Sequence, residues 1–309
     1  MDKNTRILIT GATGFIGRSL VKELCAKGYT DITAMVRRTS NAGFLKENDI
    51  NTLLGDISDQ NSLSIIKGKY DVLFHCAGFI SDSNEKRLED VNIRGTENVC
   101  NWAFEHKIKK FIYLSSIAVN SGNPEAPLRE DMPYKATNKY GISKLEAEKV
   151  AVGFRDRGLP MVIVRPCMVY GEGEPHMLPL LARLIKLRLL ILPNQGKPKL
   201  HLVSVRNVAA CLVHCMEDVR ALGGTFHIAD NEVLTVGEIF NIFAKSLGVS
   251  KPLHLSYSAT KFFTLIPFIG KRIKFLCKDR VYSIERLKTG LDFIPPYPVY
   301  SELAASVKK

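Results

Sequence analysis

The chain has 309 residues, 46% hydrophobic and 24% charged, which suits a globular protein of one large or two closely packed domains. No apolar run reaches the roughly 18–20 residues of a membrane span. The N-terminus shows no signal-peptide pattern, and the seven cysteines lack CxxC or metal spacing, so we expect a cytoplasmic protein without a metal site. Residues 166–309 carry 19 Lys and Arg against 11 Asp and Glu, part of a net charge of +12. This excess suits an anionic substrate, an anionic membrane surface or a solvated basic face, and no nucleic-acid motif is present.

Strand and helix patterns alternate through the first half of the chain. Short apolar segments predict buried parallel strands at 6–10, 31–36, 50–55, 70–76, 110–116 and 161–166. Helical patterns lie between them, at roughly 15–27, 59–67, 85–106 and 137–157. This alternation predicts a doubly wound α/β fold, in which helices cover both faces of a parallel sheet.

The regular alternation of strand and helix patterns ends after Arg165-Pro166. We expect a Leu-rich helix over 177–190, a strand running into a helix over 200–218, a strand over 224–230 and an amphipathic helix over 234–248. The sequence therefore predicts a first domain over residues 1–165 and a smaller, mainly substrate-binding α/β domain over 166–309. Residues 200–220 are expected to return to the first domain.

A glycine-rich turn, TGATGFIG, links the first predicted strand to the first predicted helix. Its first glycine permits a tight turn, the second lets the backbone approach a pyrophosphate, and the third lets helix and strand pack closely. The helix N-terminus adds unpaired N–H groups and a partial positive charge. We expect a dinucleotide here rather than a turn without a ligand, in contact with Gly11, Thr13, Gly14, Phe15, Ile16 and Gly17.

Two further positions concern the adenosine half of the dinucleotide. Arg37 follows the second predicted strand, where a carboxylate would accept the ribose hydroxyls and an arginine would bind a 2′-phosphate. We therefore expect NADP(H) in preference to NAD(H), the alternative being that Arg37 is a solvated surface residue. Asp56 and Ile57 end the third predicted strand, where the carboxylate would either accept from the adenine amino group or cap the next helix.

Tyr140 and Lys144 form a YxxxK pair near the start of a predicted helix. Four residues apart, they lie on one helix face, so the lysine charge is expected to favour the phenolate and lower the tyrosine pKa. Ser116 ends the fifth predicted strand, where its hydroxyl can hydrogen-bond a substrate carbonyl oxygen; Ser115 is the alternative. His75 is the other candidate base, but its place at the end of a buried strand favours a structural or cofactor-lining role.

Together these motifs resemble the extended short-chain dehydrogenase/reductase superfamily. The matching segments are TGATGFIG (10–17), GDI (55–57), HCAG (75–78), VNIRGTENV (91–99), YLSS (113–116), YGISK (140–144), RPCMVYGEG (165–173) and LVSVRNVAA (202–210). The resemblance implies a Rossmann-type NAD(P)-binding domain, a smaller C-terminal substrate domain and the catalytic group Ser116, Tyr140 and Lys144. It also implies cofactor contacts from Ala77, Tyr140, Lys144 and Pro166, with Asn92 in the helix behind the site.

Two branches of this superfamily compete. One resembles dihydroflavonol 4-reductases and 3β-hydroxysteroid dehydrogenases, which act on hydrophobic ketones or alcohols; the other comprises nucleotide-sugar epimerases and dehydratases with tightly held NAD. Met168 and Ala118 stand where many nucleotide-sugar enzymes carry asparagine and threonine, and no Asp-Glu or Glu-Glu pair, which a dehydratase would need, follows Ser116. With Arg37, these residues favour an NADP(H)-dependent reductase or alcohol dehydrogenase acting on a hydrophobic, steroid-like or lipid-like small molecule. A non-catalytic NADP(H)-sensing protein is a third hypothesis, which the intact Ser/Tyr/Lys set disfavours.

Residues 261–288 combine the apolar run FFTLIPFIG with eight Lys and Arg against two acidic residues. Such a segment either rests peripherally on a membrane or packs as a substrate-domain helix and loop, and we favour packing. The resemblance also suggests a homodimer formed through the helices at 85–106 and 137–157.

Overall fold

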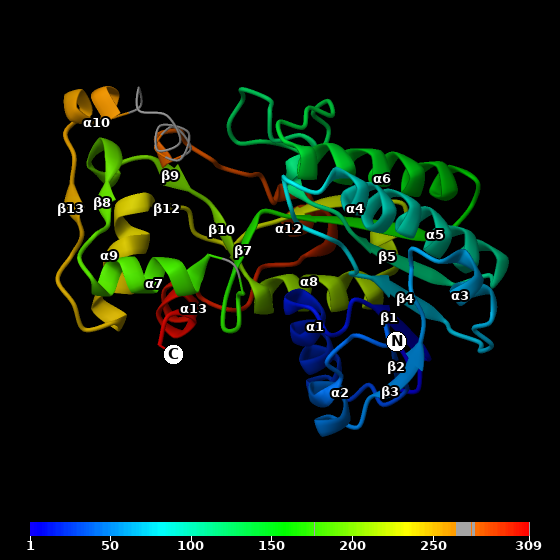
Figure 1. Ribbon diagram of the computed structural model, residues 1–309. Coiled ribbons are helices and arrows are strands. Elements are labelled where there is room, and N and C mark those ends of the chain that lie inside the picture. Colours follow the sequence, from blue (N-terminus) through cyan, green and yellow to red (C-terminus); the bar gives the residue numbers. More distant parts are fainter. Residues whose placement is uncertain (176, 264–272, 274–275, 309) are drawn as a thin grey trace.

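The computed structural model describes residues 1–308 except 176, 264–272 and 274–275. Its main sheet has seven strands, all parallel, in the order β11-β6-β5-β4-β1-β2-β3. The strands are β1 (Ile7–Thr10), β2 (Ile32–Val36), β3 (Asn51–Leu54), β4 (Val72–His75), β5 (Lys110–Leu114), β6 (Met161–Pro166) and β11 (Thr225–Ile228). The chain starts near the middle and winds outward in both directions, which confirms the predicted doubly wound α/β fold (Figure 1).

Helices cover both faces of this sheet because the strand side chains alternate between two cores. Ile7 and Ile9 of β1 pack in one core with residues of α1 and α8, whereas Leu8 packs in the other with residues of α5 and α6. The flanking helices are α1 (Phe15–Ala26), α2 (Gly43–Glu47), α3 (Gln60–Ser64), α4 (Glu85–Leu88), α5 (Gly95–Glu105), α6 (Lys139–Asp156) and α8 (Val205–Glu217).

The helix predicted over 85–106 contains a π-helical segment, η1 (Glu89–Arg94), between α4 and α5. Asn92 lies in this segment and is buried. Its side chain accepts from the Phe79 backbone N–H at 2.7 Å and donates to the Phe79 carbonyl and the Ser143 hydroxyl, each at 2.9 Å. The widened turn thus lets one side chain fix both the loop after β4 and the helix α6.

The C-terminal part of the chain builds a third core of its own. Its short strands form three two-stranded sheets, β10-β7, β12-β9 and β13-β8. Its elements are β7 (Met168–Tyr170), α7 (Leu178–Lys186), β8 (Ile191–Leu192), η3 (Pro193–Gly196), β9 (Lys199–Leu200), β10 (Leu202–Ser204), η4 (Val219–Ala221), β12 (Leu234–Thr235), α9 (Val236–Ser246), β13 (Leu253–His254), α10 (Tyr257–Phe263), α12 (Glu285–Leu291) and α13 (Val299–Ser306).

One local expectation differs from the structure, and the return of residues 200–220 to the first domain stays a prediction. The Leu-rich helix predicted over 177–190 is too long, because α7 ends at Lys186 and Arg188 takes a left-handed φ of 56° that turns the chain into β8. Within 200–220, strand β10 pairs with β7 in a separate sheet, and helix α8 packs on α1. The strand that joins the main sheet is β11, beside β6. The domain boundary at 165/166 stays a prediction.

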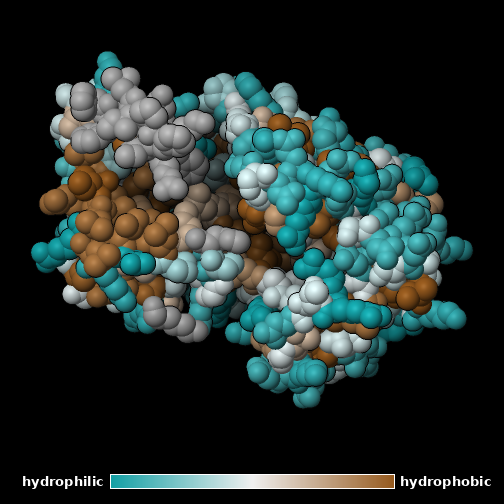
Figure 2. Space-filling view, in the orientation of Figure 1, coloured by the Kyte–Doolittle hydropathy of each residue, from teal (hydrophilic) through white to brown (hydrophobic). Residues whose placement is uncertain are grey.

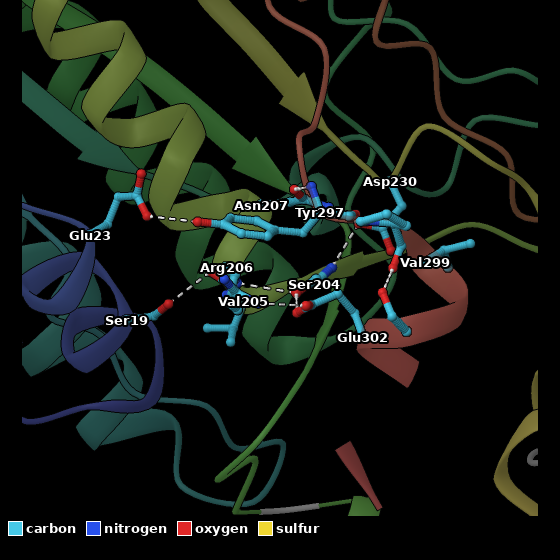
Figure 3. Close-up of polar contacts among 12 residues, drawn as sticks. Ser19, Glu23, Ser204, Val205, Arg206, Asn207, Asp230, Tyr297, Val299 and Glu302 are labelled. Carbon is cyan, nitrogen blue, oxygen red and sulfur yellow. Dashed lines mark hydrogen bonds and ion pairs between the residues drawn. The ribbon is translucent and has the colours of Figure 1, made fainter. Parts of the chain in front are cut away.

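A polar network joins the C-terminal segment to the first helix (Figure 3). The buried Asp230 carboxylate accepts from the Ser204 backbone N–H at 2.9 Å and from the Asn207 amide and the Tyr170 hydroxyl, both at 2.7 Å. Asn207 in turn bonds the backbone of Tyr297, whose hydroxyl donates to Glu23 of α1 at 3.2 Å.

Every helix within the described ranges falls short of the length or apolarity that crossing a bilayer requires.

Candidate active site

The glycine turn between β1 and α1 leaves no room for side chains. Gly11 has a φ of +75°, and a Cβ there would lie 2.6 Å from the backbone nitrogen of Ala77. A Cβ on Gly17 would lie 2.1 Å from the carbonyl oxygen of Gly11. The turn, the loop after β4 and the first turn of α1 are therefore in close contact, as the sequence predicts. Gly14 is the N-cap of α1 and has no side chain to bond the first N–H groups, which leaves this terminus suited to an anion.

Two adjoining cavities begin at this turn and share Cys76, Ala77, Gly78 and Phe79. The first is lined by the predicted cofactor residues Gly11, Thr13, Gly14, Arg37, Asp56, Ile57 and Ala77. The second is lined by Phe15, Ile16, Ala77, Ser116, Tyr140, Lys144 and Pro166. Of the predicted site residues, only Gly17 lines neither, because it is packed against the turn.

The first cavity has two arginines from separate segments, Arg37 after β2 and Arg87 in α4. The Arg37 backbone N–H donates to Ser40 Oγ at 3.1 Å, and Ser40 also lines the cavity. The Arg87 guanidinium lies 4.5 Å from the centre of the Phe79 ring. Ser40 and Arg87 were not predictable from sequence, because neither belongs to a motif.

The Asp56 carboxylate is held by its own turn. Its Oδ1 accepts from the backbone N–H and the hydroxyl of Ser58, at 3.0 and 2.7 Å. The N-cap of α3 is instead Asp59, which accepts from the Asn61 N–H at 3.0 Å. The helix-capping alternative for Asp56 is therefore wrong, whereas its place in the cavity lining is compatible with an adenosine contact.

Ser116 and Tyr140 meet in the second cavity. Burial raises the pKa of Tyr140 above its ordinary value, and a hydrogen bond with the Ser116 side chain opposes this rise. Ser115, the alternative to Ser116, is buried and donates its hydroxyl to Glu148 instead. The geometry therefore favours Ser116 as the serine that would contact a substrate.

Lys144 is buried one helical turn after Tyr140 in α6. Its Nζ donates to the Leu114 carbonyl at 2.9 Å and to the Tyr113 hydroxyl at 3.1 Å. Burial lowers the pKa of Lys144 to about 8, although Glu148 and Cys76 act to raise it. The expectation that Lys144 lowers the pKa of Tyr140 is not met in this arrangement, in which burial of the phenol dominates.

His75 is fully buried and stacks on Tyr113 at a centroid distance of 5.7 Å. Its Nδ1 lies 2.7 Å from Thr10 Oγ1, and its Nε2 lies 3.2 Å from Thr96 Oγ1. Burial, assisted by the charge of Lys144, lowers the pKa of His75 to about 3. A ring with both nitrogens engaged and so low a pKa suits the structural role and not that of a base.

A buried ion pair supports helix α6 from behind. Arg165 of β6 places its Nε 3.1 Å from both carboxylate oxygens of Glu148 in α6. Glu148 also accepts from the hydroxyls of Ser115 and Tyr134, the latter at 2.8 Å. The sequence analysis missed this group. The available signal was spacing, since Glu148 follows Lys144 by four residues and so lies on the same helix face.

The far wall of the second cavity comes from the C-terminal part of the chain and is mainly apolar. It includes Met168, Met177, Leu200, Tyr282, Glu174 and Arg280. Tyr282 and Arg280 lie some distance along the chain from every motif, so no local pattern indicated them. The cleft therefore joins a phosphate-binding turn, a tyrosine–serine–lysine group and a largely apolar wall.

A cleft at the carboxyl edge of a doubly wound sheet, with these groups, defines a dinucleotide-dependent enzyme. The model of the NAD-dependent epimerase/dehydratase family matches residues 7–229. The chain therefore belongs to this family and is an oxidoreductase of the extended short-chain dehydrogenase/reductase type.

Known proteins similar to this chain have different activities. The chain is 30% identical over 251 residues to a UDP-glucose 4-epimerase from Vibrio cholerae, covering 78% of this chain and 75% of that protein. It is 27% identical over 271 residues to a decarboxylating sterol-4-alpha-carboxylate 3-dehydrogenase from Bos taurus, covering 83% and 74%. The structure of a UDP-glucuronic acid 4-epimerase from Bacillus cereus in complex with NAD superimposes with a TM-score of 0.77 at 22% identity, over 98% and 97% of the two chains. These relatives include both branches weighed from the sequence.

Proposed function

We propose that the protein is an NADP(H)-dependent reductase or alcohol dehydrogenase for a hydrophobic carbonyl or hydroxyl compound. The observation that carries this proposal is the lining of the second cavity. Around Ser116 and Tyr140 its walls are largely apolar, with Phe79, Ile80, Met168, Val169, Met177 and Leu200 among them. A largely apolar lining is expected for a hydrophobic ligand, and the charged side chains of Glu174 and Arg280 on the far wall would contact a polar part of it.

The residues of the first cavity fit a dinucleotide phosphate. The close approach of Gly11 to Ala77 and the uncapped start of α1 suit a pyrophosphate. Arg37, with Ser40 and Arg87 in the same lining, suits the 2′-phosphate of NADP(H), because guanidinium groups form paired hydrogen bonds with phosphate. When bound, the nicotinamide would supply or accept the hydride.

Residues of the chain itself would transfer the proton to the substrate oxygen and stabilise the negative charge that develops there. Tyr140 would donate its phenolic proton to the substrate oxygen in the reducing direction, and Ser116 would hydrogen-bond that oxygen as negative charge develops. The phenol of Tyr140, whose pKa burial raises, is in its donor form at neutral pH. Lys144 would supply a positive charge behind Tyr140 and hold the nicotinamide ribose.

The test measures NADPH consumption with two substrate pools, hydrophobic ketones including steroids and nucleotide sugars, with NADH in parallel. We expect stoichiometric NADPH loss with the hydrophobic pool. Tyr140→Phe should abolish nearly all turnover while leaving NADPH binding intact, whereas Tyr300→Phe, at an exposed position, should leave both unchanged. Full activity of Tyr140→Phe would contradict the assignment of the proton donor.

The cofactor preference has its own test. Arg37→Ala should weaken NADPH binding by about 10- to 100-fold, the loss expected for one charged hydrogen-bonding group, and leave NADH binding almost unchanged. Arg38→Ala is the matched control, since Arg38 does not line the cavity in the described structure. Fluorescence titration with both dinucleotides measures the effect. Equal losses for NADPH and NADH would show that Arg37 does not read the 2′-phosphate.

The similarity to UDP-glucose 4-epimerase supports a second candidate, a nucleotide-sugar epimerase or dehydratase with tightly held NAD. In that case the purified, denatured protein would release NAD, and a nucleotide sugar would be converted without net use of NADPH. Such a result would replace the reductase proposal.

Two features of organisation are part of the proposal. A separate hydrophobic core in the C-terminal part supports a substrate domain that begins near residue 166. A homodimer through α5 and α6 would cover the exposed side chains of Phe104 and Ile142.

A further inference from the structure

The C-terminal part exposes an unusual group of large apolar side chains. We define the leucine face as Leu180, Leu187, Leu189, Ile191, Leu253 and Tyr257. Each of these residues is between 47% and 68% exposed. Figure 2 shows a hydrophobic area at the left, over the part of the molecule where Figure 1 places α7, β8 and β13. Contiguous apolar surface of this kind marks an interaction site more often than scattered apolar residues do.

The leucine face is held by regular structure. Strands β8 and β13 run parallel with Ile191 opposite Leu253, so these two exposed side chains are neighbours. Leu192, the next residue of β8, is fully buried in the core beneath. The Arg188 guanidinium donates to Ser250 Oγ at 2.6 Å and so ties the turn after α7 to the segment before β13.

The segments that carry the leucine face are predominantly basic. Residues 175–216 and 239–278 supply every member of the leucine face, and in sequence they contain 13 Lys and Arg, three of them outside the described structure, and no Asp or Glu. Glu174, which accepts from the first N–H groups of α7, directly precedes the first of these segments. Arg183, Lys186, Lys251 and Lys261 are exposed on the same elements or beside them. An apolar surface bordered by cations is complementary to a bilayer with anionic head groups, because leucines enter the acyl boundary and basic side chains meet the head groups.

We propose that the leucine face docks the enzyme on an anionic lipid bilayer. A second copy is a poorer occupant, because a two-fold contact through this face would bring the same basic segments against each other. This surface differs from the segment 261–288, which was weighed from sequence as a membrane contact and whose residues 264–272 and 274–275 lie outside the described structure. The proposal does not depend on the enzyme's substrate.

The leucine face is connected to the second cavity through helix α7 and the residue before it. Helix α7 carries Leu180, and Met177 just before this helix both lines the second cavity and is 37% exposed. Docking through the leucine face would therefore bring one wall of the candidate active site close to the lipid surface.

The experiment is co-sedimentation of the full chain with vesicles of phosphatidylcholine alone and of phosphatidylcholine mixed about equally with phosphatidylglycerol. We expect binding to the anionic vesicles that decreases with added salt, and weak binding to the neutral ones. The variant Leu187→Ser/Leu189→Ser/Leu253→Ser should reduce partitioning by at least about tenfold. The matched control is Ile65→Ser/Val219→Ser/Ile294→Ser, which removes three equally exposed apolar side chains elsewhere.

Thermal unfolding of both triple variants checks that they are folded, and a charge variant, Arg183→Glu/Lys186→Glu, tests the same surface without removing apolar area. This variant should also lose binding to anionic vesicles. Absence of binding by the wild type, or equal losses in the leucine and control variants, would overturn the proposal. Dissociation of a dimer by the leucine variant, without any vesicle binding, would overturn it too and assign the face to a second copy.

Discussion

At the scale of single residues, Lys144 couples the candidate site to its buried support. Its ammonium is solvated only by the Leu114 carbonyl and the Tyr113 hydroxyl among the contacts described, so burial lowers its pKa to about 8. Glu148 opposes this change from one helical turn further along α6. If the charge on Lys144 assists proton donation by Tyr140, the rate of reduction should fall as the pH rises past about 8. The pH profile of kcat/KM measures this fall, and Lys144→Arg should move it to higher pH.

The variant Glu148→Gln tests the buried ion pair between Glu148 and Arg165. It leaves the Arg165 guanidinium buried without its carboxylate and should lower the free energy of unfolding by about 3–5 kcal/mol. It should also lower the pKa of Lys144 further, so the fall in rate should move to lower pH. Glu146→Gln, which removes an exposed pair with Lys149 in the same helix, should cost less than about 1 kcal/mol. A pH profile unchanged by Glu148→Gln would limit Glu148 to a structural role.

At the scale of elements, the close contact between β1, the glycine turn and α1 should reverse the usual gain in stability when alanine replaces glycine in a helix. Alanine normally stabilises a helix relative to glycine by roughly 1 kcal/mol. At Gly17 the new Cβ would collide with the Gly11 carbonyl oxygen, so Gly17→Ala should lower both stability and dinucleotide affinity.

Gly153 in α6 provides the control for this prediction. A Cβ there meets nothing within 4 Å, so Gly153→Ala should raise the free energy of unfolding by about 0.5–1 kcal/mol. Chemical denaturation of the two variants, with dinucleotide titration, measures both effects. A Gly17→Ala variant as stable as Gly153→Ala would mean that the turn can move aside.

The elements that sequence predicts best are those whose determinants are local. The glycine turn, the buried strands and the Tyr140–Lys144 spacing each depend on a few neighbouring residues, and the structure has the predicted parallel sheet. The π-helical segment around Asn92 and the end of α7 were not predictable from periodicity, because contacts with Phe79 and with β13 decide them. For the same reason, the pairing of Arg165 with Glu148 and the residues of the far cavity wall could be identified only from the tertiary structure.

At the scale of the whole molecule, Asp230 makes stability depend on pH. Burial raises the pKa of this carboxyl to about 6, against the hydrogen bonds it accepts from Ser204, Asn207 and Tyr170. The folded state therefore holds a proton that the unfolded chain releases near pH 4. By linkage, this group lowers the free energy of unfolding as the pH rises from about 4 to about 6, by about 3 kcal/mol in all.

Asp230→Asn should remove this dependence, since the amide oxygen can still accept hydrogen bonds but does not titrate. The difference between wild type and variant in urea unfolding, measured from pH 4 to pH 7, isolates the contribution of this group from those of other carboxyls. Glu47→Gln, at an exposed position in α2, should leave the slope nearly unchanged. Parallel curves for wild type and Asp230→Asn would show that Asp230 ionises normally in the fold.

Strand β11 lies at the edge of the main sheet and comes late in the sequence, which affects how the protein folds during its synthesis. The chain leaves the sheet after β6, forms β7, α7, β8, β9, β10 and α8, and then returns to pair β11 with β6, whereas most residues of the C-terminal core follow β11 in sequence. A nascent chain that has not yet reached Thr225 thus presents the edge of β6 without its partner, and such an edge can pair with other chains. We therefore expect this edge of β6 to need protection, for example by a chaperone, while residues 167–224 are being synthesised.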